Sequence, residues 1–165
     1  MKTKLNLWLI CSFICAALLT FWIHGKLTHH VGDITFDRNQ DSTEFKLCND
    51  ENIYQYYSIN THYEGGKRAI KEKLQNQFSN ILLPETGLLT IRFILNCEGK
   101  TGRFRAKMIN NSLKDIDVSK YDLSPLFLSI SELKDWNLGI IRNEPQNSFY
   151  QISFKLHEGQ LTDIF

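Results

Sequence analysis

Residues 87–110 alternate apolar and polar side chains in two runs, joined by a short segment that contains glycine. Successive side chains of a strand point to opposite faces, so this period of two predicts two β-strands, each with one face on a core. Gly99 and Gly102 lie in or next to the joining segment and can adopt the backbone conformations of a tight turn. The stretch therefore predicts a β-hairpin. Its expected core-facing residues are Leu89, Ile91, Phe93 and Leu95 in the first run, and Phe104, Ala106 and Met108 in the second.

Two amphipathic helices and a further strand are predicted around this hairpin. The first helix covers residues 67–80 and ends before Pro84, and the second begins at Ser124, where the next residue is a proline suited to a first helical turn. Residues 149–157 alternate again and predict a strand, after which 161–165 return as a short strand or fold onto the edge of the sheet. The expected apolar stripes are Ile70, Leu74, Phe78 and Ile81 in the first helix, and Leu126, Phe127, Ile130 and Leu133 in the second.

Residues 5–23 contain no charged side chain, and a helix of this length crosses a bilayer at about 1.5 Å per residue. Lys2 and Lys4 precede the run, so residues 1–4 are expected to stay in the cytoplasm, with 5–24 as the anchor and the rest exported. A cleaved signal peptide is the alternative, but the run ends without the small residues of a cleavage site. Lipidation at Cys11 or Cys15 is a third reading, disfavoured by the bulky isoleucine before each cysteine.

The fold class that follows is α+β: a small three-stranded antiparallel sheet with two helices on one face, preceded by a transmembrane helix. Residues 25–47 are polar, with only scattered apolar side chains, and predict a flexible tether. The tyrosine-rich segment after them is expected to pack against the domain as a lead-in. The predicted organisation is thus a tether and lead-in at 25–63 and a folded domain at 64–165.

Net charge bears on the class of partner. The chain has 19 lysines and arginines and 18 acidic residues, and two of the lysines precede the anchor, so the exported part is close to neutral. Phosphate neutralisation supplies most of the affinity for nucleic acid, so nucleic acid is not the expected partner. A local basic face remains on the hairpin, and a solvated sheet face is the favoured explanation of it. Its residues are Arg92, Arg103, Arg105 and Lys107.

The four cysteines divide into two pairs. Cys11 and Cys15 lie in the anchor and are expected to be unpaired, whereas Cys48 and Cys97 would enter an oxidising compartment as an even pair. The prediction is a disulfide between Cys48 and Cys97, with two unpaired thiols as the alternative. His29 and His30 lack any recognised metal-ligand spacing, so no metal or cofactor is expected.

A family resemblance covers residues 64–165. Gly65-Gly66 with Ala69 and Ile70, the run 87–93 with Asn96 and Gly99-Lys100, and the strand 150–156 resemble the C-terminal domain of TonB-type energy transducers in a divergent, short-tether form. Further matching positions are Leu126, Ile130, Leu133, Trp136 and Gly139. The resemblance implies a single-pass inner-membrane protein with its C-terminal domain in the periplasm. It also implies an outer-membrane receptor and inner-membrane motor subunits as partners.

The expected function is a binding module that docks a partner protein by adding its chain to an exposed sheet edge. The alternative is an envelope adaptor or structural protein that keeps the fold without energy coupling, because residues 25–63 contain no proline and are short for a spacer. An open edge would also permit pairing into a homodimer. No enzymatic motif is present, so no catalytic residue is expected. The predicted partner-binding edge consists of Tyr150, Gln151, Ile152, Ser153, Phe154, Lys155 and Leu156.

Overall fold

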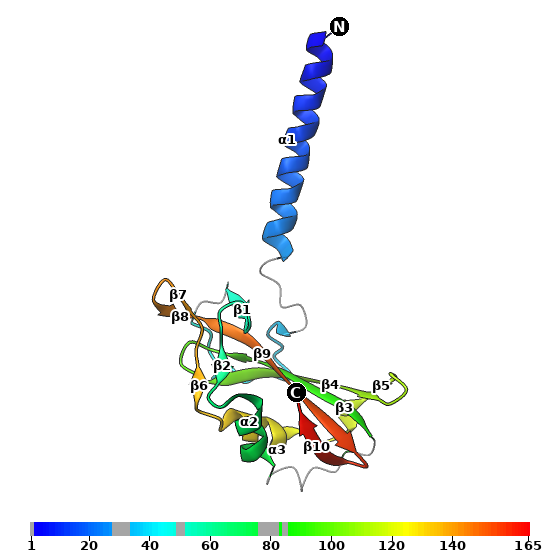
Figure 1. The fold of residues 1–165 in the computed structure, drawn as a ribbon, viewed down its shortest axis with the longest axis vertical. Helices are drawn as coiled ribbons and strands as arrows, with labels where there is room; N and C mark the ends of the chain where they lie inside the picture. Colours follow the sequence, from blue (N-terminus) through cyan, green and yellow to red (C-terminus); the bar gives the residue numbers. More distant parts are fainter. Residues whose placement is uncertain (1, 28–33, 49–51, 76–82, 84–85) are drawn as a thin grey trace. The chain divides into compact units, whose positions relative to one another are not determined.

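The computed structural model of the protein describes residues 2–27, 34–48, 52–75, 83 and 86–165 (Figure 1). The chain divides into two units, Met1–His30 and Val31–Phe165, each described by itself below. The tether residues 28–33 and the predicted helix residues 76–80, with Phe78 among them, lie outside the described residues, as does Ile81.

The first unit is the helix α1, Lys2–Leu27. Its segment Asn6–His24 is 19 residues long with a mean hydropathy of 2.0, long and apolar enough to cross a membrane, as a signal sequence also is. Two hydroxyl groups in this segment donate to backbone carbonyls of the preceding turn, Ser12 to Leu9 at 2.9 Å and Thr20 to Ala16 at 2.8 Å. A hydroxyl that is bonded within the helix needs no water, so neither side chain opposes an apolar environment.

The second unit is built on a six-stranded sheet with the order β1-β9-β3-β4-β5, to which β10 is added beside β9. The prediction of three strands is therefore wrong in number, although the mixed α+β class is confirmed. The long strands are those that the sequence predicted, whereas two of the added strands are only two or three residues long and carry no period. The strands are β1 Ile53–Gln55, β3 Gly87–Leu95, β4 Thr101–Asn110, β5 Asp115–Ile116, β9 Asn147–His157 and β10 Gln160–Ile164.

The predicted hairpin is confirmed as β3 and β4, which pair antiparallel. The Oδ1 atom of Asn96 accepts backbone N–H groups of Glu98 and Lys100 at 3.0 and 2.9 Å, which closes the turn. A bulge interrupts the register between Arg92 and Ile94, and on the opposite strand Arg103 has a φ of 53°. Such a bulge inserts one extra residue and bends the strand. Phe104, which follows it, lies against Phe93 with ring centroids 5.5 Å apart.

The helices α2, Gly66–Leu74, and α3, Ser124–Ser131, cover one face of the sheet (Figure 1). Ile70 and Leu74 of α2 are buried there, as the predicted stripe requires, and so are Leu126 and Ile130 of α3. The second helix is shorter than expected, because the chain leaves it to form β6, Trp136–Asn137, which pairs with β2, His62–Tyr63. The remaining elements are the 3-10 helix η3, Val118–Lys120, and a small hairpin of β7, Ile140–Ile141, and β8, Glu144–Pro145.

Residues 34–48, here called the strap, pack on the opposite face of the sheet rather than forming the flexible tether that was expected. Ile34 is 1 % exposed and forms a second, smaller core with Ile94 and Phe149. Phe45 of the strap lies over Gly102, where any Cβ atom would fall 2.3 Å from its ring. The apolar residues of the strap are too scattered to show a period, which is why the sequence suggested a tether.

A buried ion pair fastens the strap to β4. The guanidinium of Arg105 donates from Nη1 and Nη2 to the two carboxylate oxygens of Asp41, each at 2.8 Å, and from Nη2 to the carbonyl of Thr35 at 2.8 Å. The Asp41 side chain is only 2 % exposed. Burial alone would raise the pKa of this carboxyl, but the hydrogen bonds from Arg105 and the Asp37 backbone, together with the charges of Arg105 and Arg103, lower it overall.

The predicted disulfide between Cys48 and Cys97 is confirmed, with Cα atoms 6.0 Å apart. It joins the end of the strap to the turn between β3 and β4. Two hydrogen bonds reinforce the junction: Cys48 N–H donates to Oδ1 of Asn147 at 3.2 Å, and Nδ2 of Asn96 donates to the carbonyl of Lys46 at 3.0 Å. Cys11 and Cys15 are free.

Replacing both bridged cysteines, Cys48→Ser with Cys97→Ser, is expected to lower the free energy of unfolding by about 2–4 kcal/mol, because the bridge closes a long loop in the unfolded chain. Urea unfolding of the full chain in detergent, followed by tryptophan fluorescence, measures this. The control is Cys11→Ser with Cys15→Ser, which removes two free thiols and should leave the midpoint unchanged. Equal midpoints for both variants would show that the bridge does not stabilise the fold.

Asp41→Asn is expected to destabilise the domain by about 3 kcal/mol at pH 7, since Arg105 then stays buried without its counter-charge. The folded-state pKa of Asp41 lies below its unfolded value, so its stabilisation is present above about pH 4 and is lost as the pH falls further. The difference between wild type and variant should therefore shrink in acid. Asp115→Asn, which breaks the exposed pair with Lys107, should have a much smaller effect at pH 7.

Candidate docking surface

The predicted docking edge, residues 150–156, lies inside the sheet. β3 pairs with β9 from Ser148 to Leu156, while β1 pairs with 147–149 and β10 with 154–157 on the other side. Ser153 and Phe165 also exchange both backbone hydrogen bonds, at 3.2 and 2.8 Å. Backbone groups alternate in direction along a strand, so Gln151 alone of these residues faces the gap between β1 and β10. The premise of an open edge at β9 was wrong, because two short strands of the same chain take that place.

The side chains of this segment lead to the same conclusion. Ile152, Phe154 and Leu156 are 0–1 % exposed and belong to the main core, whereas Gln151 and Lys155 point to the other face and are exposed. The hydroxyl groups of Ser153 and Thr90 lie 3.2 Å apart on that face. Residues 150–156 therefore hold the sheet together, and any partner role for them remains a prediction.

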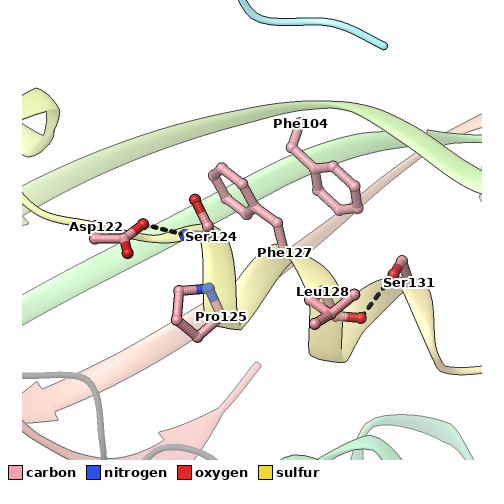
Figure 2. A pocket seen from close by; sticks show the side chains of 7 residues that line it. All are labelled: Phe104, Asp122, Ser124, Pro125, Phe127, Leu128 and Ser131. Atoms are coloured by element: carbon pink, nitrogen blue, oxygen red, sulfur yellow. Dashed lines mark hydrogen bonds between the residues drawn. The ribbon is translucent and has the colours of Figure 1, made fainter.

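An apolar groove lies instead between α3 and β4 (Figure 2). We call it the α3 groove, and its volume is about 580 Å³. Phe104 and Phe127 stack in it with ring centroids 5.0 Å apart and planes inclined by 11°. Leu128 is 61 % exposed. The lining consists of Phe104, Asp122, Ser124, Pro125, Phe127, Leu128 and Ser131.

Local sequence explains why these side chains meet. Pro125 fits the first turn of α3, where its missing N–H costs no hydrogen bond, and Oδ1 of Asp122 accepts the Ser124 N–H at 3.0 Å. The hydroxyl of Ser131 donates to the carbonyl of Leu128 at 2.7 Å. The polar lining groups are thus occupied within the chain, so what the groove offers to a partner is mainly apolar surface.

A second hollow of about 530 Å³ shares Phe104, Phe127 and Asp122 with the α3 groove and extends it along β4. Asp117 lines this extension, as do Val118 of η3 and Gln40 of the strap. Hydrogen bonds from Ser119 and from Ser124 lower the pKa of Asp117 and of Asp122 respectively, so both carboxyls are ionised at neutral pH. Arg105 also lines the extension, but Asp41 neutralises its charge.

The groove runs beside an unpaired stretch of β4. Within the described part of the chain, β5 pairs only with Met108 and Ile109, so no strand lies along the outer side of β4 from Thr101 to Lys107. The carbonyl oxygen of Phe104 accepts a hydrogen bond from Nη1 of Arg105, and the two atoms are 2.8 Å apart. This side chain partly covers the edge, as charged residues at natural sheet edges do.

The described residues contain no cluster of three or more histidine, cysteine or acidic side chains that could hold a metal ion. His62 contacts the carbonyl of Asn60 at 2.8 Å, and His157 lies 3.4 Å from the hydroxyl of Thr86. Each histidine is thus engaged separately with a neighbouring loop residue.

No protein-family model, curated protein or solved structure matches this chain. Its function must therefore be argued from its own geometry.

Proposed function

We propose that this protein is a membrane-anchored binding module that captures a partner protein in the α3 groove. The observation that carries the proposal is the exposure of Leu128 beside the stacked rings of Phe104 and Phe127. Most of the chain's other large apolar side chains in the folded domain are buried, and apolar surface of this kind gains free energy when a partner excludes water from it. A few side chains usually dominate the binding energy of an interface, and they are typically those that enter a hollow of the partner.

Two features support a membrane anchor and an oxidising compartment. α1 is apolar over 19 residues and follows Lys2 and Lys4, which favours a cytoplasmic N-terminus and an exported domain. The Cys48–Cys97 disulfide supports an oxidising compartment, where such bonds persist. In the envelope that the TonB resemblance implies, these two features favour a domain in the periplasm, anchored to the inner membrane.

The length of the connector favours an adaptor over a transducer that crosses the envelope. Because the strap is folded onto the sheet, only residues 28–33 separate the end of α1 from Ile34. Six residues extend over about 22 Å at most. We therefore favour a partner close to the anchoring membrane. A TonB-type role, with a receptor and motor subunits as partners, is the second candidate, favoured by the order of α2, β3, β4, α3 and β9.

Crosslinking in cells tests the proposal. A photoreactive amino acid is placed at Leu128 in the full chain, and a second variant carries it at Gln151, the exposed position in the β9 gap. We expect Leu128 to capture a discrete protein, and inner-membrane or periplasmic partners would support the adaptor role. An outer-membrane receptor captured at either position would support the second candidate.

The matched control carries the same probe at Leu113, which is 80 % exposed in the turn after β4. Capture at Leu128 that does not exceed capture at Leu113 would contradict docking in the α3 groove. Capture at Gln151 alone would return the partner site to β9.

A further inference from the structure

We infer that the α3 groove selects an extended protein segment in which a bulky apolar side chain stands next to lysine or arginine. The inference rests on the proposed function and specifies the chemistry of the partner. It follows from the two carboxylates at the border of the apolar lining, Asp122 in the groove and Asp117 in its extension.

Carboxylates border the apolar hollow. Among the described residues, Asp122 is the one charged residue that lines the groove itself, and Asp117 joins it in the extension along β4. Both carboxylates also accept backbone N–H groups of nearby serines, at 3.1 Å from Ser119 and 3.0 Å from Ser124, which fixes their positions. A segment whose apolar side chain enters the groove would therefore meet fixed negative charge at the adjoining residues.

The cations nearby are already engaged. Arg105 gives both terminal nitrogens to Asp41, whose side chain is almost fully buried. Lys120 has its Nζ 3.9 Å from Asp117, which is a long and exposed pair, and a partner cation can compete with it. Lys107 pairs with Asp115 at 3.1 Å, beyond the extension. Among the described residues no lysine or arginine forms an ion pair with Asp122, so the charge in the lining of the groove itself is negative, which complements lysine or arginine and disfavours acidic partners.

The same charges distinguish a protein segment from a membrane surface. Exposed apolar side chains in a membrane-anchored protein would also suit insertion into lipid, but such surfaces carry lysine and arginine to meet anionic headgroups. Here the rim carries aspartates. The groove therefore fits a basic and apolar peptide better than it fits an anionic bilayer.

The test uses the full chain in nanodiscs of zwitterionic phosphatidylcholine, with empty discs as the blank. Two fluorescein-labelled eight-residue peptides are titrated by anisotropy, one alternating leucine with lysine and the other leucine with glutamate. We expect the lysine peptide to bind at least about tenfold more tightly at low salt, with the preference falling as added salt screens the charges.

Two double variants test whether the preference for the lysine peptide comes from Asp117 and Asp122 or from the overall charge of the protein. Asp117→Asn with Asp122→Asn keeps the side-chain oxygens that accept the serine N–H groups, and it should reduce the preference to about threefold or less. Glu44→Gln with Glu144→Gln removes the same charge from the strap and from β8 and should leave the preference intact. Leu128→Ala should weaken the binding of the lysine peptide.

Three outcomes would overturn the inference. The two peptides bind equally, neither peptide binds, or the preference for the lysine peptide is unchanged in the Asp117→Asn, Asp122→Asn variant. A further experiment places a photoreactive group at Leu128 in discs that contain phosphatidylglycerol. If it labels lipid despite an excess of the lysine peptide, the membrane is the occupant of the groove and the inference is overturned as well. Failure here, with protein capture at Leu128 in cells, would leave the proposed function standing and refute only the chemistry of the partner.

Discussion

The fold depends on β3, which is paired along both edges, buried along one face and covered on the other face at Ile94. β4 and β9 flank it over almost its whole length, so its backbone is satisfied without water. Leu89, Ile91 and Phe93 face the helices at 0 % exposure, while Ile94 faces the strap at 0 % exposure. Burying one such side chain contributes about 1.5–3 kcal/mol. The second face of β3 carries Thr90 and Arg92 but is apolar at Ile94, and the strap supplies the covering layer at that end of the sheet.

Much of this was predictable because the signals were local. The period of two in the sequence predicted β3, β4 and β9. The helical spacing of apolar residues predicted that Ile70 and Leu74 face the core, and the pair of cysteines that was expected to be exported predicted the disulfide. The strap was not predictable in the same way, because Ile34, Phe45 and Leu47 have no regular spacing and become a core only through Ile94 and Phe149. Likewise β1 and β6 depend on the strands they pair with, β9 and β2, because segments of two or three residues have little preference of their own for the strand conformation.

The pairing of β9 shows where sequence reasoning failed. Residues 161–165 were expected to return as a short strand or fold onto the sheet edge, yet residues 150–156 were still expected to form an open edge, and the three residues of β1 carried no signal of their own. The signal for the α3 groove, however, was present. Leu126, Phe127 and Leu128 are consecutive, and successive residues turn by about 100° around a helix, so the three cannot all face one core. One had to remain outside, and it is Leu128.

The strap links the membrane anchor to the electrostatics of the groove. Asp41 holds Arg105, and Arg105 follows Phe104, the aromatic ring shared by the groove and its extension. The pair therefore both fastens the strap and removes a positive charge from the region where Asp117 and Asp122 dominate. Were the strap detached, the Arg105 guanidinium would stand beside those carboxylates without Asp41 and would offset them. The negative charge at the groove is thus a property of the domain with its strap in place, so the proposed preference for a basic partner depends on the Asp41–Arg105 pair.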